Sequence, residues 1–288
     1  MQSSGKTYRA VSLIKNVMEG YTMNKKDVYT NYGIAYQGGK IASPLGRINP
    51  LLVKGNAKLG AAIYHFSTLP GTGEFSAWIN GVSYIVRGTC ACDCAGCYAK
   101  RGNYQYQSSV DALAMRTVIA RYHLDYFKRA VIAQVAADNV RFVRVHAAGD
   151  FFSEDYINAW REIATACPSV VFWTYTKNPI AEHAFDDIAN FNVVSSVIPG
   201  KGFNFGHCDY ILAVYEALKS AGHDPYICRC GIDKNQHCSN CKGCSVHKYV
   251  LFLEHGTGYN AERDPLFPVV KALIDSQDIT IATESARV

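Results

Sequence analysis

The sequence predicts an α/β fold built on a parallel sheet, either closed as a complete or partial barrel or open as a doubly wound sheet. Two observations predict this class. From about residue 81, short β-branched runs alternate with longer amphipathic stretches, the pattern of βαβ units. Loops with unusual polar residues follow these runs, at the carboxyl ends of strands where α/β proteins place their functional sites.

The alternation predicts the strands and helices in order along the chain. Strands are expected at residues 82–87, 141–146, 170–175, 193–198 and 225–228. Helices are expected at about 109–137, 153–166, 180–190, 208–221 and 265–276. Ser108 and Ser109 suit the start of the first helix and Ser153 that of the second, because serine side chains cap free backbone N–H groups.

Composition divides the chain into three parts. Residues 1–75 are rich in Gly and Pro turns and form an N-terminal extension that packs on the core. Residues 76–225 form the β/α core. Residues 226–288 form a cysteine-rich metal-binding segment with a C-terminal helix.

Overall composition excludes several protein classes. The 288 residues are 49% hydrophobic, 18% charged and 12% aromatic, unlike disordered, collagen-like or coiled-coil chains. No apolar run approaches the roughly 20 residues of a membrane helix, and the first residues show no export signal, so we expect a cytoplasmic protein without membrane contact. The net charge of +5 is too small to indicate nucleic-acid binding on its own.

Cysteines are the most informative residues. Nine of the eleven fall in two short windows, 90–97 and 228–244, among Gly, Asp, Asn and Lys rather than in apolar runs. Disulfides are rare in a reducing cytosol, and buried packing cysteines would be scattered through the core. The two windows therefore predict metal ligation.

The first window contains Cys90, Cys94 and Cys97 with C-x3-C-x2-C spacing. Three thiolates on one loop can hold three irons of a [4Fe–4S] cluster and leave the fourth iron without a protein ligand. A four-thiolate zinc site is the alternative, but zinc ligands usually come as two pairs separated by a longer loop. The extra thiol of Cys92 leaves a second ligand set open, in which Cys92 replaces Cys90.

This spacing resembles the radical S-adenosylmethionine enzymes. The resemblance implies a partial (β/α)6-type barrel, with the cysteine loop after the first strand and a Gly-acid motif after the second, where Gly149 and Asp150 would bind the methionine ammonium. It also implies reductive cleavage of the cofactor to a 5′-deoxyadenosyl radical, with a reductant such as flavodoxin or ferredoxin. The chain departs from the family pattern at Gly96, where an aromatic residue is usual.

Further polar residues are expected near that site. If Val143 and Val145 face the covering helices, Arg144 and His146 point into the barrel, where they are costly to bury without an anion or cofactor. Together with Lys177, which follows the next strand, they are candidates for contacts with the cofactor carboxylate or substrate, and His146 is also a catalytic candidate. Tyr98, beside Cys97, is a further candidate for cofactor contact.

The second window predicts a closed metal site. Cys238, Cys241 and Cys244 have the C-x2-C-x2-C spacing of ferredoxins, and Cys228 or Cys230 would be the fourth ligand. Four protein ligands suit an auxiliary [4Fe–4S] cluster. Zinc is the alternative, with four thiolates or with His247 as a ligand.

A second resemblance covers more of the chain. Residues 56–60 (NAKLG), 97–99 (CYA), 144–151 (RVHAAGDF) and 172–176 (FWTYT) are similar to a phage family known as gene product 88, whose members also have a late cysteine group. This resemblance spans residues 56 to about 256. It implies a phage or prophage source and action in the host cytoplasm, but no reaction.

The sequence thus predicts an iron–sulfur enzyme of the radical S-adenosylmethionine type that modifies an unidentified substrate. The alternative is a non-catalytic, zinc-binding phage protein that binds nucleic acid or a host protein. The enzyme requires an open coordination position on its metal, and the structural protein does not.

Overall fold

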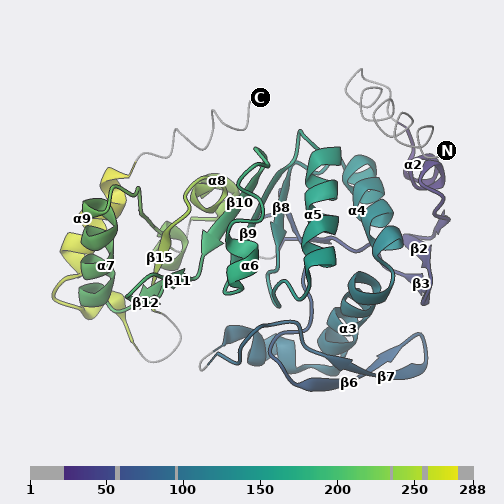
Figure 1. Ribbon diagram of the computed structural model, residues 1–288, viewed down its shortest axis with the longest axis horizontal. Coiled ribbons are helices and arrows are strands. Elements are labelled where there is room, and N and C mark those ends of the chain that lie inside the picture. The colour runs from purple at the N-terminus through teal and green to yellow at the C-terminus, as the bar shows by residue number, and fades with distance from the viewer. Residues whose placement is uncertain (1–22, 56–58, 95–96, 234–235, 255–258, 278–288) are drawn as a thin grey trace. The chain divides into compact units, whose positions relative to one another are not determined.

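The computed structural model describes residues 23–55, 59–94, 97–233, 236–254 and 259–277 (Figure 1). The chain divides into two units. The first comprises Met1–Val53 and Tyr64–Val170, and the second comprises Lys54–Ile63 and Val171–Val288. Each unit is described by itself below, and the predicted boundaries near residues 75 and 225 stay predictions.

The first unit begins with elements that the sequence did not predict. Helix α2 (Lys25–Asn31) starts at Asn24, whose side chain accepts a hydrogen bond from the Asp27 N–H at 3.0 Å. The short strands β1 (Tyr36–Gln37), β2 (Lys40–Ser43) and β3 (Gly46–Ile48) follow as an antiparallel sheet. The described part of the expected extension therefore has regular structure of its own.

Strand β7 (Val82–Arg87) has the predicted bounds but not the predicted partner. It pairs antiparallel with β6 (Glu74–Ile79) in a two-stranded sheet, so its assignment to the parallel sheet was wrong. The reason is the turn between the two strands, where Asn80 and Gly81 both have positive φ, 49° and 81°. Two such residues close a tight hairpin, which forces the second strand back along the first.

The parallel partner of β8 (Phe142–Val145) is the segment that contains β5 (Ile63–His65) and the residues after it. The Phe66 N–H donates to the Arg144 carbonyl at 3.0 Å, and the Thr68 N–H donates to the Ala148 carbonyl at 3.0 Å. Both segments therefore run in the same direction.

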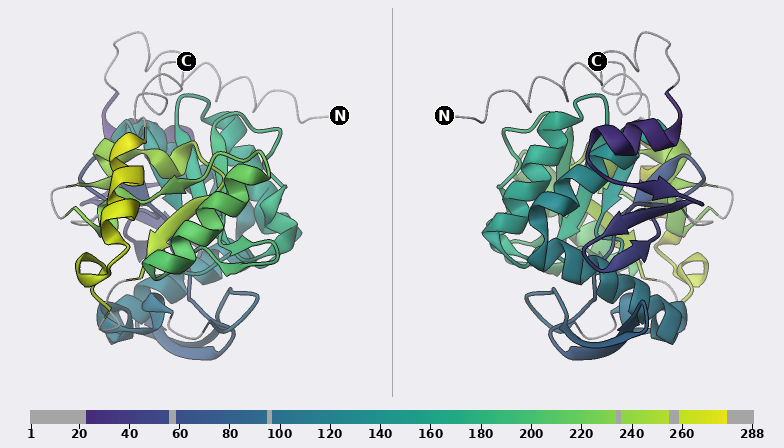
Figure 2. Two further views of the ribbon diagram at one scale, coloured as in Figure 1. Left: turned by 90° about the vertical axis from the view of Figure 1, so that its left-hand side faces the viewer. Right: turned by 90° about the vertical axis from the view of Figure 1, so that its right-hand side faces the viewer.

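Three helices complete the first unit. They are α3 (Gln107–Tyr122), α4 (Leu124–Asp138) and α5 (Glu154–Ala166), and α4 lies beside α5 (Figures 1 and 2). The single helix expected at 109–137 is two helices, because the chain leaves helical geometry at His123 (φ −136°). Edge-to-face aromatic contacts of Phe66, Phe127 and Trp160, at 5.2–5.5 Å, fill the core between the helices and the β5 segment.

The second unit contains parallel pairs as well. Strands β9 (Val171–Thr176) and β10 (Phe191–Ser195) pair in parallel. Between them α6 (Pro179–Glu182) is shorter than the expected 180–190, because the chain then turns to stack Phe185 on Phe191 at 3.9 Å. A hairpin of β11 (Val197–Ile198) and β12 (Gly202–Phe203) comes next.

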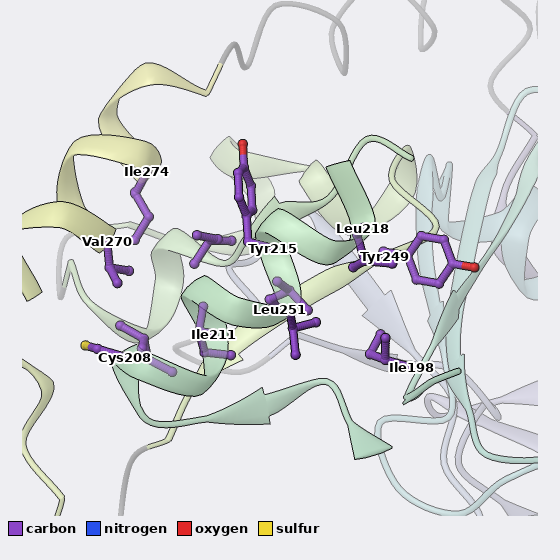
Figure 3. Close-up of a cluster of buried hydrophobic side chains, with 12 residues drawn as sticks. Ile198, Cys208, Ile211, Tyr215, Leu218, Tyr249, Leu251, Val270 and Ile274 are labelled. Atoms are coloured by element: carbon purple, nitrogen blue, oxygen red, sulfur yellow. The ribbon is translucent and has the colours of Figure 1, made fainter. Parts of the chain in front are cut away.

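A second parallel sheet has the order β13 (Phe205–Gly206), β15 (Val250–Leu253) and β14 (Tyr226–Ile227). Helices α7 (Cys208–Ser220) and α9 (Phe267–Ser276) contact each other and this sheet (Figure 2). Their apolar faces meet in a buried cluster that includes Ile211, Leu251 and Val270 (Figure 3).

Short turns connect these elements. The first unit has η1 (Tyr98–Lys100) and η2 (Gly102–Gln105), and the second has η3 (Arg229–Gly231), α8 (Cys238–Cys241), η4 (Gly243–Ser245) and η5 (Ala261–Arg263). The fold is thus mixed α/β with parallel sheets. Among the described residues, no helix is both long and apolar enough to span a membrane.

Candidate metal centres and the neighbouring polar site

The first cysteine window starts at the end of the β5 segment. The Thr89 N–H donates to the Leu69 carbonyl at 3.0 Å, and the Cys90 N–H donates to the Gly71 carbonyl at 3.1 Å. In return the Gly71 N–H donates to Cys90 Sγ at 3.1 Å. The β6–β7 hairpin is therefore an insertion between a parallel strand and its cysteine loop, and the loop still follows a strand of the parallel sheet.

The thiols of this window lie on one folded loop. The Cys97 N–H donates to the Cys94 carbonyl at 3.3 Å, and the Sγ atoms of Cys92 and Cys94 are 3.7 Å apart. Burial raises the pKa of Cys90 to about 12, and the neighbouring charges of Asp150, Cys97 and Cys94 add to the rise. Cys92 is exposed, whereas Cys90 is half-buried. Ala95 and Gly96 lie outside the described residues.

The Gly149–Asp150 turn is hydrogen-bonded to the residue before Cys90. The Asp150 N–H donates to Thr89 Oγ1 at 3.1 Å, and Thr89 Oγ1 also shares a hydrogen bond with Thr68 Oγ1 at 2.8 Å. The Asp150 side chain is only 5% exposed, and its Oδ1 accepts from the Phe151 N–H at 2.8 Å. The turn is thus fixed against the start of the cysteine loop.

Asp150 does not cap the following helix. The N-cap of α5 is Ser153, as predicted, and its hydroxyl accepts from the Tyr156 N–H at 3.2 Å. The expected serine cap of the preceding helix is absent, since α3 begins at Gln107 with no side-chain hydrogen bond from its N-cap Tyr106. The buried Asp150 carboxylate is therefore not explained by helix capping.

Tyr98 and Arg144 lie together beside the same loop. The Tyr98 hydroxyl donates to the Ala147 carbonyl, and Arg144 Nη2 donates to the Tyr98 hydroxyl at 3.3 Å. Tyr98 is 58% exposed, so it stands at the solvent-facing side of this group. Four of the polar residues predicted near the first cysteine window therefore lie beside its loop: Tyr98, Arg144, Gly149 and Asp150.

His146 lies elsewhere than expected. Strand β8 ends at Val145, and His146 has a φ of +57°, so the strand alternation with Arg144 does not extend to it. Its Nε2 hydrogen-bonds with the Tyr156 hydroxyl at 2.9 Å, and its ring meets Phe151 edge to face at 4.6 Å. Within the described part of the chain, its buried Nδ1 has no hydrogen-bond partner. The catalytic role of His146 stays a prediction.

Burial of His146 gives a test of stability against pH. Burial lowers the pKa of His146 to about 3 and, with the charges of Arg116 and Arg144, lowers that of His65 to about 4. Both are neutral in the folded protein, while the unfolded chain takes up protons below a pH of about 6.5. We expect the free energy of unfolding to fall between about pH 7 and pH 5, by up to about 1.4 kcal/mol per pH unit for each histidine.

Urea denaturation at intervals between these pH values measures this slope. The variant His146→Gln should flatten it, because it removes the buried imidazole. A free energy of unfolding that is equal at both ends of the range would contradict the burial of neutral imidazoles.

Lys177 belongs to the second unit and contacts an aromatic ring there. Its Nζ lies 5.5 Å from the centroid of Phe203, which is 41% exposed. Phe203 in turn stacks on Phe205 at 5.8 Å with nearly parallel planes. Lys177 therefore borders an exposed aromatic pair.

The second cysteine window gathers its thiols around Cys230. The Cys238 thiol donates to Cys230 Sγ at 3.9 Å, and the neighbouring thiols of Cys228, Cys238 and Cys241 raise the pKa of Cys230. Cys228 and Cys241 are buried, and both pack against Val194 and Val250. As they stand, no three or more His, Cys, Asp or Glu side chains among the described residues form a group arranged to hold a metal ion.

Several residues at these sites escaped sequence reasoning. Thr68 and Thr89 connect the cysteine loop to the Gly149–Asp150 turn, and the Tyr226 hydroxyl shares a hydrogen bond with Cys241 Sγ at 3.0 Å. Thr89 directly precedes Cys90, so its position next to a predicted ligand was a usable signal. Thr68 and Tyr226 had no such signal, because their contacts depend on the fold.

Comparisons with known proteins identify relatives. The sequence model of a family described as "Gene product 88" matches residues 50–248, a stretch that includes both cysteine windows. The Gene 88 protein of Mycobacterium phage L5 is 28% identical over 134 residues, 39% of this chain and 54% of that protein. The Gene 88 protein of Mycobacterium phage D29 is 30% identical over 131 residues, again 39% of this chain and 54% of that protein.

The chain thus spans about half the length of the curated relatives it matches. No solved structure matches it. Because the family match at residues 50–248 covers more than half of the 288 residues, the protein belongs to the gene product 88 family of phage proteins.

Proposed function

We propose that the protein is an iron–sulfur enzyme of the radical S-adenosylmethionine type, in which Cys90, Cys94 and Cys97 hold a [4Fe–4S] cluster on a partial β/α barrel. The observation that supports this most is the position of the loop. It starts at the carboxyl end of the β5 segment and is hydrogen-bonded through Thr89 to the Gly149–Asp150 turn. When bound, such a cluster supplies the electron that cleaves S-adenosylmethionine.

The types of residue and their spacing support the proposal. Three thiols on one loop leave one iron of a cubane without a protein ligand, and an amino acid can occupy such a position. The buried carboxylate of Asp150 is a partner for an ammonium, and the guanidinium of Arg144 is a partner for a carboxylate. Gly149, Tyr98 and Lys177 remain candidates for further contacts with cofactor or substrate.

The second window would hold a further metal, and the enzyme would act in a host cytoplasm with flavodoxin or ferredoxin as reductant. Protein purified without oxygen and reconstituted with iron and sulfide should be brown and contain at least four irons per chain. Reduction should give an electron paramagnetic resonance signal that changes when S-adenosylmethionine is added. Protein that takes up only stoichiometric zinc under these conditions would contradict the proposal.

The role of Asp150 can be tested by the variant Asp150→Asn. A carboxylate that accepts a hydrogen bond from an ammonium contributes about 1.5–3 kcal/mol, so we expect S-adenosylmethionine to bind roughly ten- to a hundredfold more weakly. Asparagine can still accept from the Phe151 N–H, which preserves the turn. Calorimetric titration of the reconstituted variant measures the affinity.

Asp155→Asn is the matched control, because Asp155 lies exposed in the first turn of α5. It should leave the affinity unchanged. If Asp150→Asn also binds the cofactor as tightly as the parent protein, Asp150 has a structural role only.

A non-catalytic protein that binds nucleic acid is the second candidate. It is favoured by the exposed, stacked rings of Phe203 and Phe205 with the Lys177 ammonium beside them. Bases stack on such rings in single-stranded nucleic-acid complexes, and a cation next to them attracts phosphate. The iron measurement above separates the two candidates, because this one requires no open iron.

A further inference from the structure

The β6–β7 hairpin directs some of its backbone groups away from its own two strands. Hydrogen-bonded pairs alternate along an antiparallel hairpin, starting with the residues that flank a two-residue turn, here Ile79 and Val82. The Gly88 N–H donates to the Gly73 carbonyl at 2.8 Å, which fits the same alternation at the far end. The backbone groups of the pairs in between point outward: Trp78 with Ser83, and Ser76 with Ile85.

The outer edge of β6 is already occupied. Helix α3 lies along this strand (Figure 1). The Trp78 N–H donates to Asp111 Oδ1 at 2.8 Å. Gln107 Nε2 donates to the Ser76 carbonyl at 3.1 Å. Because both acceptor and donor come from α3, the helix takes the place that a further strand would have at this edge.

The outer edge of β7 is open at Ser83 and Ile85. Within the described part of the chain, no hydrogen bond reaches the outward N–H and C=O groups of these two residues. Both residues are exposed, Ile85 to 66%. The opening ends at Arg87, whose carbonyl accepts from Arg121 Nη1 at 3.0 Å. The edge thus offers two N–H donors and two C=O acceptors in a row.

Strand β7 lacks the features that usually keep an edge strand from pairing. Protected edges carry a lysine, a proline, a bulge or an inward charge. Residues 82–86 (VSYIV) include no charge and no proline, and their register with β6 has no bulge. Beside the open edge, Ile85 lies diagonal to Trp78, which is 57% exposed, on one face of the hairpin. An exposed apolar edge of this kind favours association with another strand.

A second copy of β7 matches this edge with no group left over. In an antiparallel pair, residues that point their backbone groups at the partner strand lie opposite each other. If Ser83 of one copy lies opposite Ile85 of the other, every open N–H and C=O group of both strands is used. Pairing Ile85 with its own counterpart would instead bring Ser83 opposite Arg87, whose carbonyl is already bonded.

Charge and packing favour the same register. It places each Arg87 opposite Gly81 of the other copy, so the two guanidinium groups lie at opposite ends of the new sheet. On the exposed face, Ile85 becomes diagonal to Ile85 of the other copy as well as to Trp78 of its own, which makes one continuous apolar strip. One pair of short strands buries less surface than the roughly 1,200–2,000 Å² of stable complexes, so we expect a roughly micromolar dissociation constant.

We propose that two copies of the protein form a symmetric dimer in which their β7 strands pair antiparallel, Ser83 opposite Ile85, and join the two hairpins into a four-stranded sheet. This dimer goes beyond the proposed function and does not depend on it, because none of the candidate metal or cofactor residues lies in β7.

Sedimentation velocity of the full-length protein at concentrations of about 1–100 µM measures the association. A thiol reductant is present, so that no disulfide between copies contributes. We expect monomer at the lowest concentration and dimer at the highest. Over the same range, hydrogen exchange followed by mass spectrometry should slow at Ser83 and Ile85, since their N–H groups become paired. Association that leaves the exchange of this strand unchanged would overturn the proposal.

Two variants change the open edge alone. Ser83→Pro removes an outward N–H and leaves the bonds to β6 intact, because proline is tolerated where the N–H of an edge strand faces away from the sheet. Ile85→Lys changes an exposed side chain to the residue that most often protects edges. We expect each variant to associate at least about tenfold more weakly than the parent protein.

Ser76→Pro is the matched control, because the Ser76 N–H also points outward but lies on the edge that α3 covers. It should leave the association unchanged, and circular dichroism checks that all three variants are folded. A parent protein that stays monomeric up to about 100 µM would overturn the proposal and leave the edge to a strand of a different protein. A dimer that neither Ser83→Pro nor Ile85→Lys weakens would overturn it as well.

Discussion

Replacing Cys94 and Cys97 together by alanine should abolish cleavage of S-adenosylmethionine and remove the iron of the first window, while the metal of the second window remains. Each of these cysteines would bind a different iron, and a cubane held by one remaining thiolate is not retained. Each window has enough cysteines for a metal of its own, so the loss should not spread. Anaerobic metal analysis and the yield of 5′-deoxyadenosine measure both effects.

Cys92→Ala is the matched control for this variant. Cys92 is in the same loop but exposed, whereas the Cys90 thiol is half-buried, accepts a hydrogen bond from Gly71 and faces the charge of Asp150. We therefore expect Cys92→Ala to keep its iron and its activity, and Cys90→Ala to lose both. The reverse result would assign Cys92, Cys94 and Cys97 as the ligands.

A different outcome would refute the separation of the two sites. If the Cys94→Ala, Cys97→Ala double variant loses all of its metal while its circular dichroism spectrum is unchanged, the two windows contribute to one shared site. If it retains all of its iron, the first window holds no cluster.

Local patterns in the sequence predicted elements but not their partners. The alternation at residues 82–87 predicts a strand, and β7 has these bounds. Its antiparallel partner depends on the turn at Asn80 and Gly81, which permits a hairpin but does not by itself exclude a longer connection. The parallel partner of β8 includes β5, whose three residues are too few to show a period in the sequence.

The candidate site could likewise be predicted only where its signals are local in the sequence. The cysteine windows and the Gly149–Asp150 motif could be found because their spacing and their places after strands are local features. The contact between them could not, because it passes through Thr68 and Thr89, two ordinary residues whose hydroxyl groups meet only after the strands have paired. The position of His146 was missed because one residue with positive φ changes the side on which a side chain lies.

Gly149→Ala should be the most destabilising single substitution at the first site. Gly149 has a φ of +82°, and an added Cβ would lie 2.0 Å from Thr68 Oγ1 and 2.6 Å from Thr89 Oγ1. Thr68 is fully buried and holds Thr89, so its hydroxyl cannot move away without breaking that hydrogen bond. The left-handed backbone costs about 1–2 kcal/mol and overpacking about 1–3 kcal/mol, so we expect the free energy of unfolding to fall by about 2–5 kcal/mol.

Gly81→Ala separates the two contributions, because Gly81 has nearly the same φ, +81°, but no atom within 4 Å of an added Cβ. Gly81→Ala should lower the free energy of unfolding only by the cost of the strained backbone, about 1–2 kcal/mol. Adding Thr68→Ala to Gly149→Ala should recover part of the lost stability, since it removes the shorter contact. Urea denaturation of the parent protein, the two single variants and the double variant measures the coupling energy between the two positions. If Gly149→Ala is no less stable than Gly81→Ala, the Gly149–Asp150 turn does not lie against Thr68 and Thr89. The geometry that connects this turn to the cysteine loop would then be wrong.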